Sequence, residues 1–495
     1  MTSETADDLR KLVYPETYFV GLAPPELRLA LLSRGILAPA GGPLRYLELG
    51  FGSGFSLNVH AAANDGAFWG NDFVRAHVDG AASIAAISGA NAHFLPDSFA
   101  ELLNRDDLPT FDVIAAHGIW TWVPDEDRAA IVELLKRKLA PGGVFYVSYN
   151  NTAGWASVVY LRQMMKLYLA EKGGRADVSE AVAFARSLHI AGAAYFKENP
   201  TAAAEVGLMA TRNAIYLQQE YFLDDWKLMS LAEIEAALRP AGLEFGAQFP
   251  LIMHDDELVL GERGRDIVAK LESPILRETV RESFQGMGFR QDLFVREPKV
   301  LTADERRDRF RAQRFLLTTQ SRNVALKGPS PWGELDLGAR GCVPVMKAFE
   351  ALGPGPHALA DIEAAAPAMP IDDLISRIIL LAAVKVVRPA LSIEEQRAVS
   401  QSCAALNAYV LSLPGGAAVL ASPVLGAGVD ISPLERALIV SQSAGKVTVD
   451  DCAAEISRAC PGELNGRSAH QVAAALHADH LPIFRAMGLI PTSET

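Results

Sequence analysis

Short apolar runs, separated by segments of helical periodicity, fill the first 150 residues of the chain. Five runs have the length and composition of buried strands, and they lie at residues 44–49, 66–72, 92–95, 111–116 and 144–149. Between them the apolar positions recur every three or four residues, as they do on one face of a helix. Strands that alternate with helices in this way predict a parallel, doubly wound α/β sheet that binds its ligand at the carboxyl ends of the strands.

The sheet is predicted to close much later in the chain, after a helical interruption. Residues 151–212 alternate helical runs with polar breaks, and we interpret them as an insertion that serves as a lid or in dimerisation. A helix at residues 230–239 follows the cap residue Ser230, stops at Pro240 and leads into a strand. Residues 1–150 are therefore assigned to a ligand-binding core, and residues 213–255 to the strands that close its sheet.

The second half of the chain is predicted to be mainly helical. Residues 256–325 form a helical middle region, which includes a mixed-charge helix in "LTADERRDRFRAQRF". Residues 326–495 contain two loosely similar halves with the winged-helix order of helix, turn, helix and strand, which we assign to recognition or dimerisation. The expected fold is a Rossmann-like α/β sheet with a helical insertion, followed by mostly helical middle and C-terminal, winged-helix-like domains.

Composition and charge narrow the range of partners. The 495 residues carry a formal net charge of -13, which argues against binding of nucleic acid, since phosphate binding needs a dense positive surface. The chain shows neither a signal-peptide pattern nor the apolar length of a membrane span, so a cytoplasmic protein is expected. The four cysteines have no CxxC spacing, and we expect neither a disulfide nor a metal site.

A glycine-rich turn, "GFGSG" at residues 50–54, follows the first predicted strand directly. A dinucleotide fingerprint would need glycine where the chain has Phe55, and a phosphate-binding P-loop would need a lysine that is absent here. The remaining pattern, Glu48-x-Gly50-x-Gly52-x-Gly54, resembles the first motif of class I S-adenosylmethionine (SAM) methyltransferases. In such a turn the glycines let the backbone approach the methionine part of the cofactor, and the acidic residue can meet its amino group.

Polar residues stand at the ends of the following strands, where a ligand of this sheet would bind. Asp72 occupies a position suited to a carboxylate that accepts hydrogen bonds from the ribose hydroxyls, and Asp97 and Ser98 occupy a usual place for contacts to adenine. Asp72 could instead be an ordinary helix cap, and Asp97 could cap the helix that starts at Ser98, but the order of these residues along the chain favours a cofactor pocket. The predicted cofactor-binding residues are Glu48, Gly50, Phe51, Gly52, Gly54, Asp72, Phe73, Asp97, Ser98 and His117.

The residues expected at the reacting edge follow the fourth and fifth strands or precede the first. Methyl transfer from a sulfonium is an in-line displacement, so the enzyme supplies position, a dry pocket and, for an amine acceptor, removal of a proton. His117 could serve as that base or could form only a structural hydrogen bond at its strand end. Tryptophans at this edge can also be packing residues. The predicted catalytic residues are His117, Tyr18, Trp122, Tyr149 and Asn150, and Tyr14, Trp120 and Trp155 complete the aromatic set.

The stretch "HGIWTWVPDEDRAAIVELLKRKLAPGGVFYVSYNNTAGW", together with the later "YLQQEYFLDDW", resembles class I methyltransferases that carry a methyltransferase regulatory domain. The rickettsial outer-membrane-protein lysine methyltransferases belong to that group. The resemblance implies SAM as the methyl donor, a protein lysine as the acceptor and a homodimer. Two alternatives stay open: O- or N-methylation of a small molecule, with the insertion as a lid, and a SAM-binding regulatory protein without catalysis.

Overall fold

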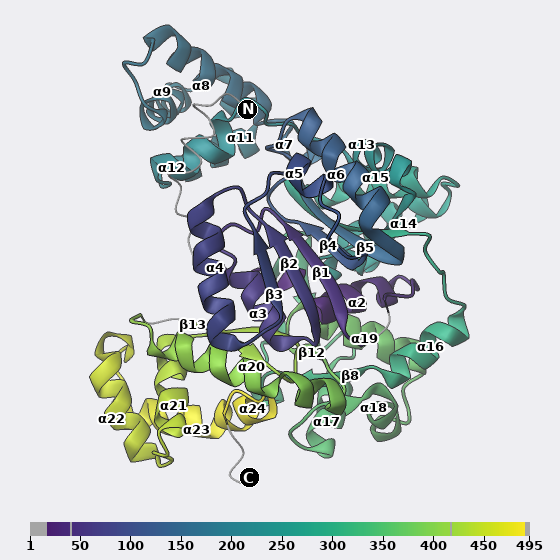
Figure 1. Ribbon diagram of the computed structural model, residues 1–495, viewed down its shortest axis with the longest axis vertical. Helices are drawn as coiled ribbons and strands as arrows, with labels where there is room; N and C mark the ends of the chain where they lie inside the picture. The colour runs from purple at the N-terminus through teal and green to yellow at the C-terminus, as the bar shows by residue number, and fades with distance from the viewer. Residues whose placement is uncertain (1–16, 40–41, 416–417, 491–495) are drawn as a thin grey trace.

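The computed structural model describes residues 17–39, 42–415 and 418–490, and its centre is a seven-stranded sheet. The strands lie in the order β3-β2-β1-β4-β5-β7-β6 (Figure 1). Their bounds are Leu44–Leu49 for β1, Gly66–Asn71 for β2, Ala92–Leu95 for β3, Phe111–Ala116 for β4, Leu139–Asn150 for β5, Leu243–Gln248 for β6 and Phe289–Arg296 for β7. The α/β fold class predicted from the sequence is confirmed. The first four strands lie on the predicted runs, and β5 includes the predicted run 144–149 but begins earlier, at Leu139.

Strand β7 corrects the prediction in two respects. It pairs antiparallel with both β5 and β6, so the sheet is mixed. It also lies within residues 256–325, which were predicted to be mostly helical, whereas residues 213–255 contribute only β6 to the sheet. In the sequence "FRQDLFVR" of β7, the charged residues Arg290 and Asp292 are buried. A half-buried strand usually has apolar side chains at such positions, so the alternation that identifies a strand is weak here.

Helices cover both faces of the sheet. On one face α2 (Pro24–Ser33), α3 (Phe55–Ala63) and α4 (Arg75–Ser88) share a core with the β1 side chain Tyr46 and the β5 side chain Tyr146. On the other face α5 (Phe99–Leu103), α6 (Asp125–Lys138) and α13 (Leu231–Leu238) pack over Leu47 and Tyr149. Neighbouring residues of one strand thus belong to opposite faces, as the period of two requires.

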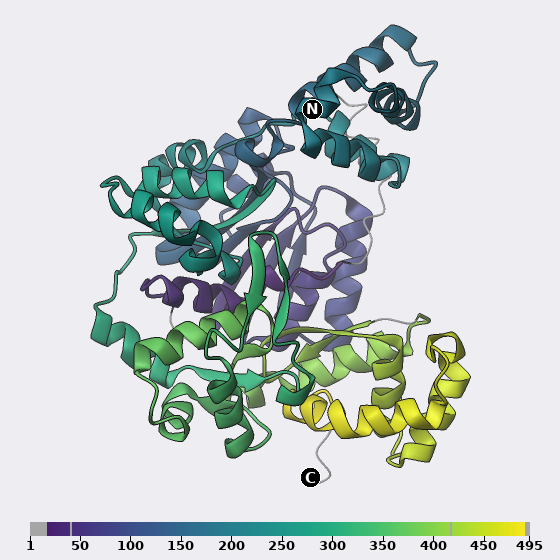
Figure 2. The same ribbon diagram turned by 180° about the vertical axis from the view of Figure 1, so that it is seen from behind.

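The helical insertion forms a unit with its own apolar core. It contains α7 (Thr152–Trp155), α8 (Val159–Lys172), α9 (Val178–Ile190), α10 (Ala194–Glu198) and α11 (Pro200–Met209), and α12 (Ala214–Leu217) packs with it. Figures 1 and 2 show this unit projecting from one end of the molecule, while the C-terminal region occupies the other end. The predicted helical character of residues 151–212 is what the structure has.

The middle helices α14 (Asp256–Ala269) and α15 (Pro274–Gln285) lie between β6 and β7 in the chain, and α16 (Ala303–Ala312) follows β7. The helix α15 begins at the N-cap Ser273, with Pro274 at its first position, where the missing amide hydrogen costs nothing. Its inner side carries buried polar residues, among them Glu282, which face the end of the sheet that continues into the insertion.

The C-terminal region consists of two small α/β units. In the first unit, a three-stranded sheet packs with three helices, in the predicted winged-helix order. The strands are β8 (Arg314–Leu317), β11 (His357–Ala358) and β12 (Val387–Ala390), and the helices are α17 (Val343–Leu352), α18 (Leu359–Ala365) and α19 (Ile371–Ala383). A separate hairpin of β9 (Lys327–Ser330) and β10 (Gly333–Asp336) precedes α17. In the second, α20 (Ile393–Ser412) precedes a hairpin of β13 (Ala418–Ser422) and β14 (Ala427–Ile431), and the helices are α21 (Pro433–Ser443), α22 (Val449–Ala459), α23 (Ala469–Asp479) and α24 (Leu481–Ala486). The second half ends in a helix where the predicted repeat required a strand.

The second C-terminal unit packs directly on the core helix α3. Asn64, which follows α3, donates a hydrogen bond from its side chain to the Gly426 carbonyl at 2.7 Å, and Ser402 on α20 donates to the Ala62 carbonyl at 2.7 Å. The two parts share one apolar cluster, and α20 lies beside α3 (Figure 1). None of the helices formed by the described residues has the length and the apolar composition that crossing a membrane requires.

Candidate active site

The glycine turn between β1 and α3 has a backbone that only glycine adopts without strain. Gly50, Gly52 and Gly54 have φ angles of +64°, +61° and +70°. A Cβ atom on Gly50 would lie 2.3 Å from Cδ1 of Ile119, and one on Gly54 would lie 2.6 Å from Cβ of Ala81. The turn is therefore held between the segment after β4 and helix α4, beside the point where the strand order reverses between β1 and β4, which is the usual ligand crevice of such sheets.

Asp72, which directly follows β2, links the end of that strand to the glycine turn through a hydrogen bond. Its Oδ2 accepts a hydrogen bond from the backbone amide of Gly52 at 2.9 Å, and its Oδ1 accepts one from the amide of Val74 at 2.9 Å. Nδ1 of His77 lies 3.3 Å from Oδ1. Each carboxylate oxygen can accept two hydrogen bonds, so Asp72 keeps acceptor capacity for a hydroxyl donor.

Glu48 is buried one residue before the end of β1. Burial raises the pKa of its carboxyl group to about 8, and Oε2 has no hydrogen-bond partner among the described residues. A buried oxygen without a partner costs free energy unless a donor reaches it. The ammonium group of the methionine part of SAM is such a donor, so the residues of this turn fit the cofactor.

The other predicted cofactor residues occupy different environments. Phe51 is buried and packs edge-on against Phe94, whereas Phe73 is exposed. Oδ2 of Asp97 accepts a hydrogen bond from Arg105 at 2.9 Å. Ser98 caps α5: its hydroxyl accepts from the amide of Glu101 and donates to the carboxylate of that residue. The cap of α5 is therefore Ser98, where the sequence suggested Asp97, and the contact of Ser98 with adenine stays a prediction.

His117 stands at the end of β4 within a group of rings. Nδ1 lies 2.9 Å from the hydroxyl of Tyr146, and the ring centroid lies 4.1 Å from that of Phe19 and 5.7 Å from that of Phe289. Burial lowers the pKa of His117 to about 4, so its ring is neutral at pH 7. A neutral imidazole held by Tyr146 is suited to orienting groups at this edge more than to holding a proton there.

Asn150 connects the ends of β4 and β5 with the segment after the insertion. Its amide donates to the hydroxyl of Thr121 at 2.8 Å, its carbonyl accepts from the amide of Met229 at 3.1 Å, and its side-chain nitrogen donates to Oε1 of Glu220 at 3.3 Å. Two hydrogen bonds thus fix the backbone of Asn150, and a third, from its side chain, holds the Glu220 carboxylate near the ends of β4 and β5.

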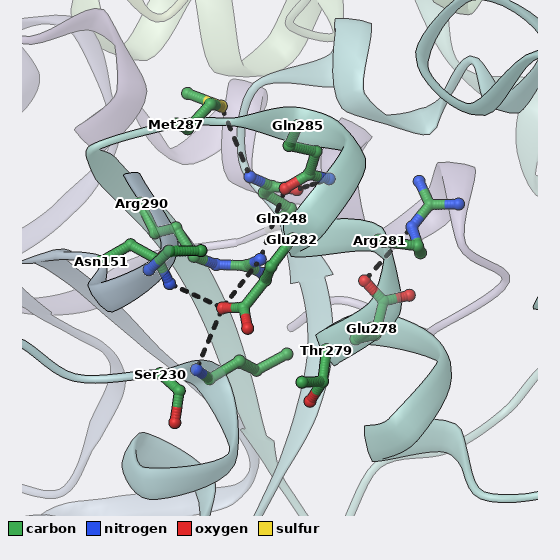
Figure 3. A network of polar contacts seen from close by, with 12 residues as sticks. Asn151, Ser230, Gln248, Glu278, Thr279, Arg281, Glu282, Gln285, Met287 and Arg290 are labelled. Atoms are coloured by element: carbon green, nitrogen blue, oxygen red, sulfur yellow. Dashed lines mark hydrogen bonds and ion pairs between the residues drawn. The ribbon is translucent and has the colours of Figure 1, made fainter. Parts of the chain in front are cut away.

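The next residue, Asn151, is held by a buried ionic network (Figure 3). Its side-chain nitrogen donates to Oε1 of Glu282 at 2.7 Å, and the same oxygen accepts from the amide of Leu231 at 3.1 Å. Arg290 lies 3.4 Å from that oxygen and donates two hydrogen bonds to Asp292, each at 2.9 Å. The network joins α13, α15, β7 and the start of the insertion.

Two of the predicted catalytic residues do not face the reacting edge. The hydroxyl of Tyr18 accepts from the amide of Gly428 at 2.6 Å and lies 3.2 Å from Nε2 of His60, so it is buried against the C-terminal region beside the second half of α3. The hydroxyl of Tyr149 donates to Asp292 at 2.6 Å on the sheet face under α13. A tertiary contact thus engages each hydroxyl away from the strand ends, and the predicted catalytic roles of Tyr18 and Tyr149 stay predictions. Tyr14 lies outside the described residues.

The tryptophans differ in exposure. Trp120 is fully buried and donates from Nε1 to Sδ of Met229 at 3.2 Å, which makes it a packing residue. Trp122 is half-buried beside it, and its predicted catalytic role stays a prediction. Trp155, at the start of the insertion, packs against Tyr221 and Trp226.

The sequence reasoning missed Phe19, Tyr146 and Glu220. Tyr146 could have been found, because it lies on the same side of β5 as Ser148 and Asn150 by the period of two. Glu220 carries no local signal: it lies in the short π-helical turn Gln218–Phe222, 70 residues beyond its partner Asn150.

Comparisons with known proteins agree with this geometry. Residues 47–143 match the family model described as a methyltransferase domain, and residues 213–296 match a predicted methyltransferase regulatory domain. The chain is 29% identical to the uncharacterized protein sll1526 of Synechocystis over 87% of this chain and 86% of that protein, and 30% identical to the uncharacterized protein RP789 of Rickettsia prowazekii over 39% of this chain and 35% of that protein.

Among solved structures, PKMT2 from Rickettsia typhi in complex with AdoHcy superposes with a TM-score of 0.69 and 17% identity, covering 96% of this chain and 99% of that one. At this identity the likeness establishes a shared fold along nearly the whole chain. The methyltransferase model covers the glycine turn and the neighbouring strand ends. The regulatory-domain model covers the segment that carries Glu220 and Glu282. The chain is a SAM-dependent methyltransferase that joins a class I methyltransferase domain to a methyltransferase regulatory domain.

Proposed function

We propose that this enzyme methylates the side-chain nitrogen of lysine residues in a protein. The observation that carries the proposal is the extent of the likeness to PKMT2, a rickettsial protein lysine methyltransferase, which covers 96% of this chain. The shared part therefore includes the helical insertion and the C-terminal region as well as the SAM-binding core. Elements outside the core of a methyltransferase are the ones that can select its acceptor.

The predicted site residues divide between holding the cofactor and orienting the acceptor. Bound SAM supplies a methyl group that its sulfonium makes electrophilic. Glu48 would meet the cofactor's ammonium group, Asp72 would meet its ribose, and the glycine turn would approach its methionine part. His117 and Asn150 stand at the ends of β4 and β5, where they would line the path of the acceptor.

A lysine acceptor sets a chemical requirement on the site. Only the neutral amine has a lone pair, and with a pKa near 10.4 the free energy of deprotonation at pH 7 is roughly 4 to 5 kcal/mol. The pocket must lower this cost through burial of the amine or through a proton acceptor.

The test incubates the protein with methyl-labelled SAM and a bacterial lysate, and then separates macromolecular from small labelled products. We expect label in protein, and acid hydrolysis should release it as methyl-lysine. The control is the same lysate with its lysines acetylated, which should take up no label. Label confined to small molecules would replace the proposal with a metabolite methyltransferase, and tight SAM binding without any transfer would indicate a regulatory protein.

The homodimer implied by the family resemblance stays a prediction. Exposed apolar side chains on the insertion, among them Leu167 and Ile190, support it. Light scattering of the purified protein tests it directly, and a monomeric mass would contradict it.

A further inference from the structure

We propose that the carboxylate of Glu220 binds the ammonium group of the acceptor lysine and accepts its proton, with Asn150 holding the carboxylate in position. This inference rests on the proposed lysine methylation and adds the residue that would make lysine a competent acceptor. Glu220 belongs to the segment matched by the regulatory domain, residues 213–296, so the inference also gives that segment a direct part in the reaction.

The position of Glu220 follows from contacts at the strand ends. Asn150 is the last residue of β5, and its amide donates to Thr121, four residues beyond His117. On the same side of β5, the hydroxyl of Ser148 accepts from the amide of Gly118 at 2.8 Å. The segments that follow β4 and β5 are therefore joined, and Oε1 of Glu220 lies 3.3 Å from the Asn150 side chain at this junction.

Among the described residues, the carboxylate of Glu220 has no cationic partner. Across the described parts of the chain, no lysine or arginine forms an ion pair with Glu220, although the residue is only partly exposed. Burial raises the pKa of Glu220, the hydrogen bond from Asn150 lowers it, and the nearby charge of Glu205 raises it. A partly buried carboxylate without a counter-ion binds a cation or a proton more strongly than an exposed one does.

Among the neighbouring polar and aromatic groups described below, the Glu220 carboxylate is the one best suited to bind an ammonium ion. Glu205 on α11 accepts a hydrogen bond from the hydroxyl of Tyr221. Two of the nearby rings already have a cation on one face: the guanidinium of Arg162 lies 4.4 Å from the ring centroid of Trp226, and that of Arg212 lies 5.1 Å from the centroid of Tyr216. These arginines compete with the lysine for those two ring faces, whereas the Glu220 carboxylate attracts its ammonium group directly.

The reaction balances without any further reagent. The lysine ammonium gives one proton to the Glu220 carboxylate, and the freed lone pair forms the bond from nitrogen to the methyl carbon. The electron pair of the broken carbon–sulfur bond stays on sulfur, and the product is a methylammonium ion. Glu220 then releases its proton to solvent.

The decisive variant is Glu220→Gln, which keeps an oxygen for Asn150 but cannot accept a proton. We expect methyl transfer to the lysines of a denatured lysate to fall by roughly 100- to 1000-fold at pH 7.5. SAM affinity, measured by calorimetry, should stay within about threefold of wild type. At pH 10 much of the lysine is already neutral, so the difference should shrink to less than about tenfold. Asp224→Asn, which removes an exposed carboxylate paired with Lys166, serves as the control and should stay within about threefold of wild type at both pH values.

The outcomes separate the two proposals. Labelled lysine with wild type, together with a Glu220→Gln variant that is active within threefold at pH 7.5, overturns the role of Glu220 and leaves lysine methylation standing. A loss of equal size at pH 7.5 and pH 10, or a loss explained by weaker SAM binding, likewise overturns the role of Glu220 alone. Absence of labelled lysine with the wild-type enzyme overturns both.

Discussion

The carboxylate of Asp72 accepts a hydrogen bond from the backbone amide of Gly52 at 2.9 Å, so the end of β2 holds the glycine turn that follows β1. Asp72 therefore has two functions in the proposed pocket: it fixes the turn, and it keeps lone pairs for the ribose hydroxyls. A single substitution should disturb both.

We predict that Asp72→Ala weakens SAM binding strongly. Loss of charge-assisted hydrogen bonds costs about 1.5 to 3 kcal/mol for each bond, which corresponds to a rise in Kd of roughly 10- to 150-fold. Calorimetric titration with SAM measures it. Asp79→Ala on the exposed side of α4, where Asp79 pairs with Arg75, is the matched control and should bind as wild type does. Unchanged affinity in Asp72→Ala would remove Asp72 from the site.

Binding of SAM should release a proton from Glu48. Burial raises the pKa of Glu48 to about 8, so the free protein carries this group mostly protonated at pH 7. An ammonium group placed beside it favours the carboxylate and lowers that pKa, so affinity should rise with pH by up to about tenfold for each unit and level off above pH 8. Titrations in two buffers of different ionisation enthalpy measure the released proton, and Glu48→Gln should abolish the release. Proton uptake on binding would contradict the assignment.

The buried Arg290 network should matter for stability far more than surface ion pairs do. Arg290→Met leaves the carboxylates of Asp292 and Glu282 buried without their cation, and breaking such a pair costs about 3 to 5 kcal/mol. Chemical denaturation monitored by circular dichroism tests this. Arg137→Ala removes an arginine paired with Glu133 on the exposed side of α6 and should leave stability almost unchanged. Equal effects of the two substitutions would show that the network is not a significant source of stability.

Acid should destabilise the protein through three histidines. Burial lowers the pKa of His117 to about 4 and is the main reason that the pKa values of His60 and His254 fall to about 3. These groups stay neutral in the folded chain but bind protons in the unfolded chain below pH 6.5, so stability falls as pH drops from 6.5 towards 4.

Glu48 acts in the opposite direction, since its raised pKa keeps one proton in the folded state that the unfolded state loses above about pH 4.5. For these four groups together, the balance is a net uptake of about two protons on unfolding near pH 5 in the absence of SAM. Unfolding midpoints should be nearly level close to pH 7 and should fall increasingly steeply from about pH 6.5 to pH 5, and His254→Gln should reduce the slope. A flat profile would contradict the neutral, buried state of these rings.

Local patterns were sufficient for the parts of the molecule whose signal is contiguous. The glycine turn at residues 50–54 needs positive φ angles that few other residues adopt. The strands before and after it follow from short apolar runs, and the start of α13 follows from its cap residue Ser230. The strand β7 escaped prediction because its polar residues are satisfied by partners far away in the chain, such as Tyr149 and Glu282.

The sequence by itself determined the first five strands of the SAM-binding sheet, the order of their ends and, through the family resemblance, the class of reaction, because each depends on residues close together along the chain. Only the tertiary structure decided which polar side chains remain available at the reacting edge. It placed the hydroxyls of Tyr18 and Tyr149 in buried hydrogen bonds and brought Glu220 to Asn150 across 70 residues. The physical reason is that the partners of a side chain are set by packing between elements, which no periodicity along one element records.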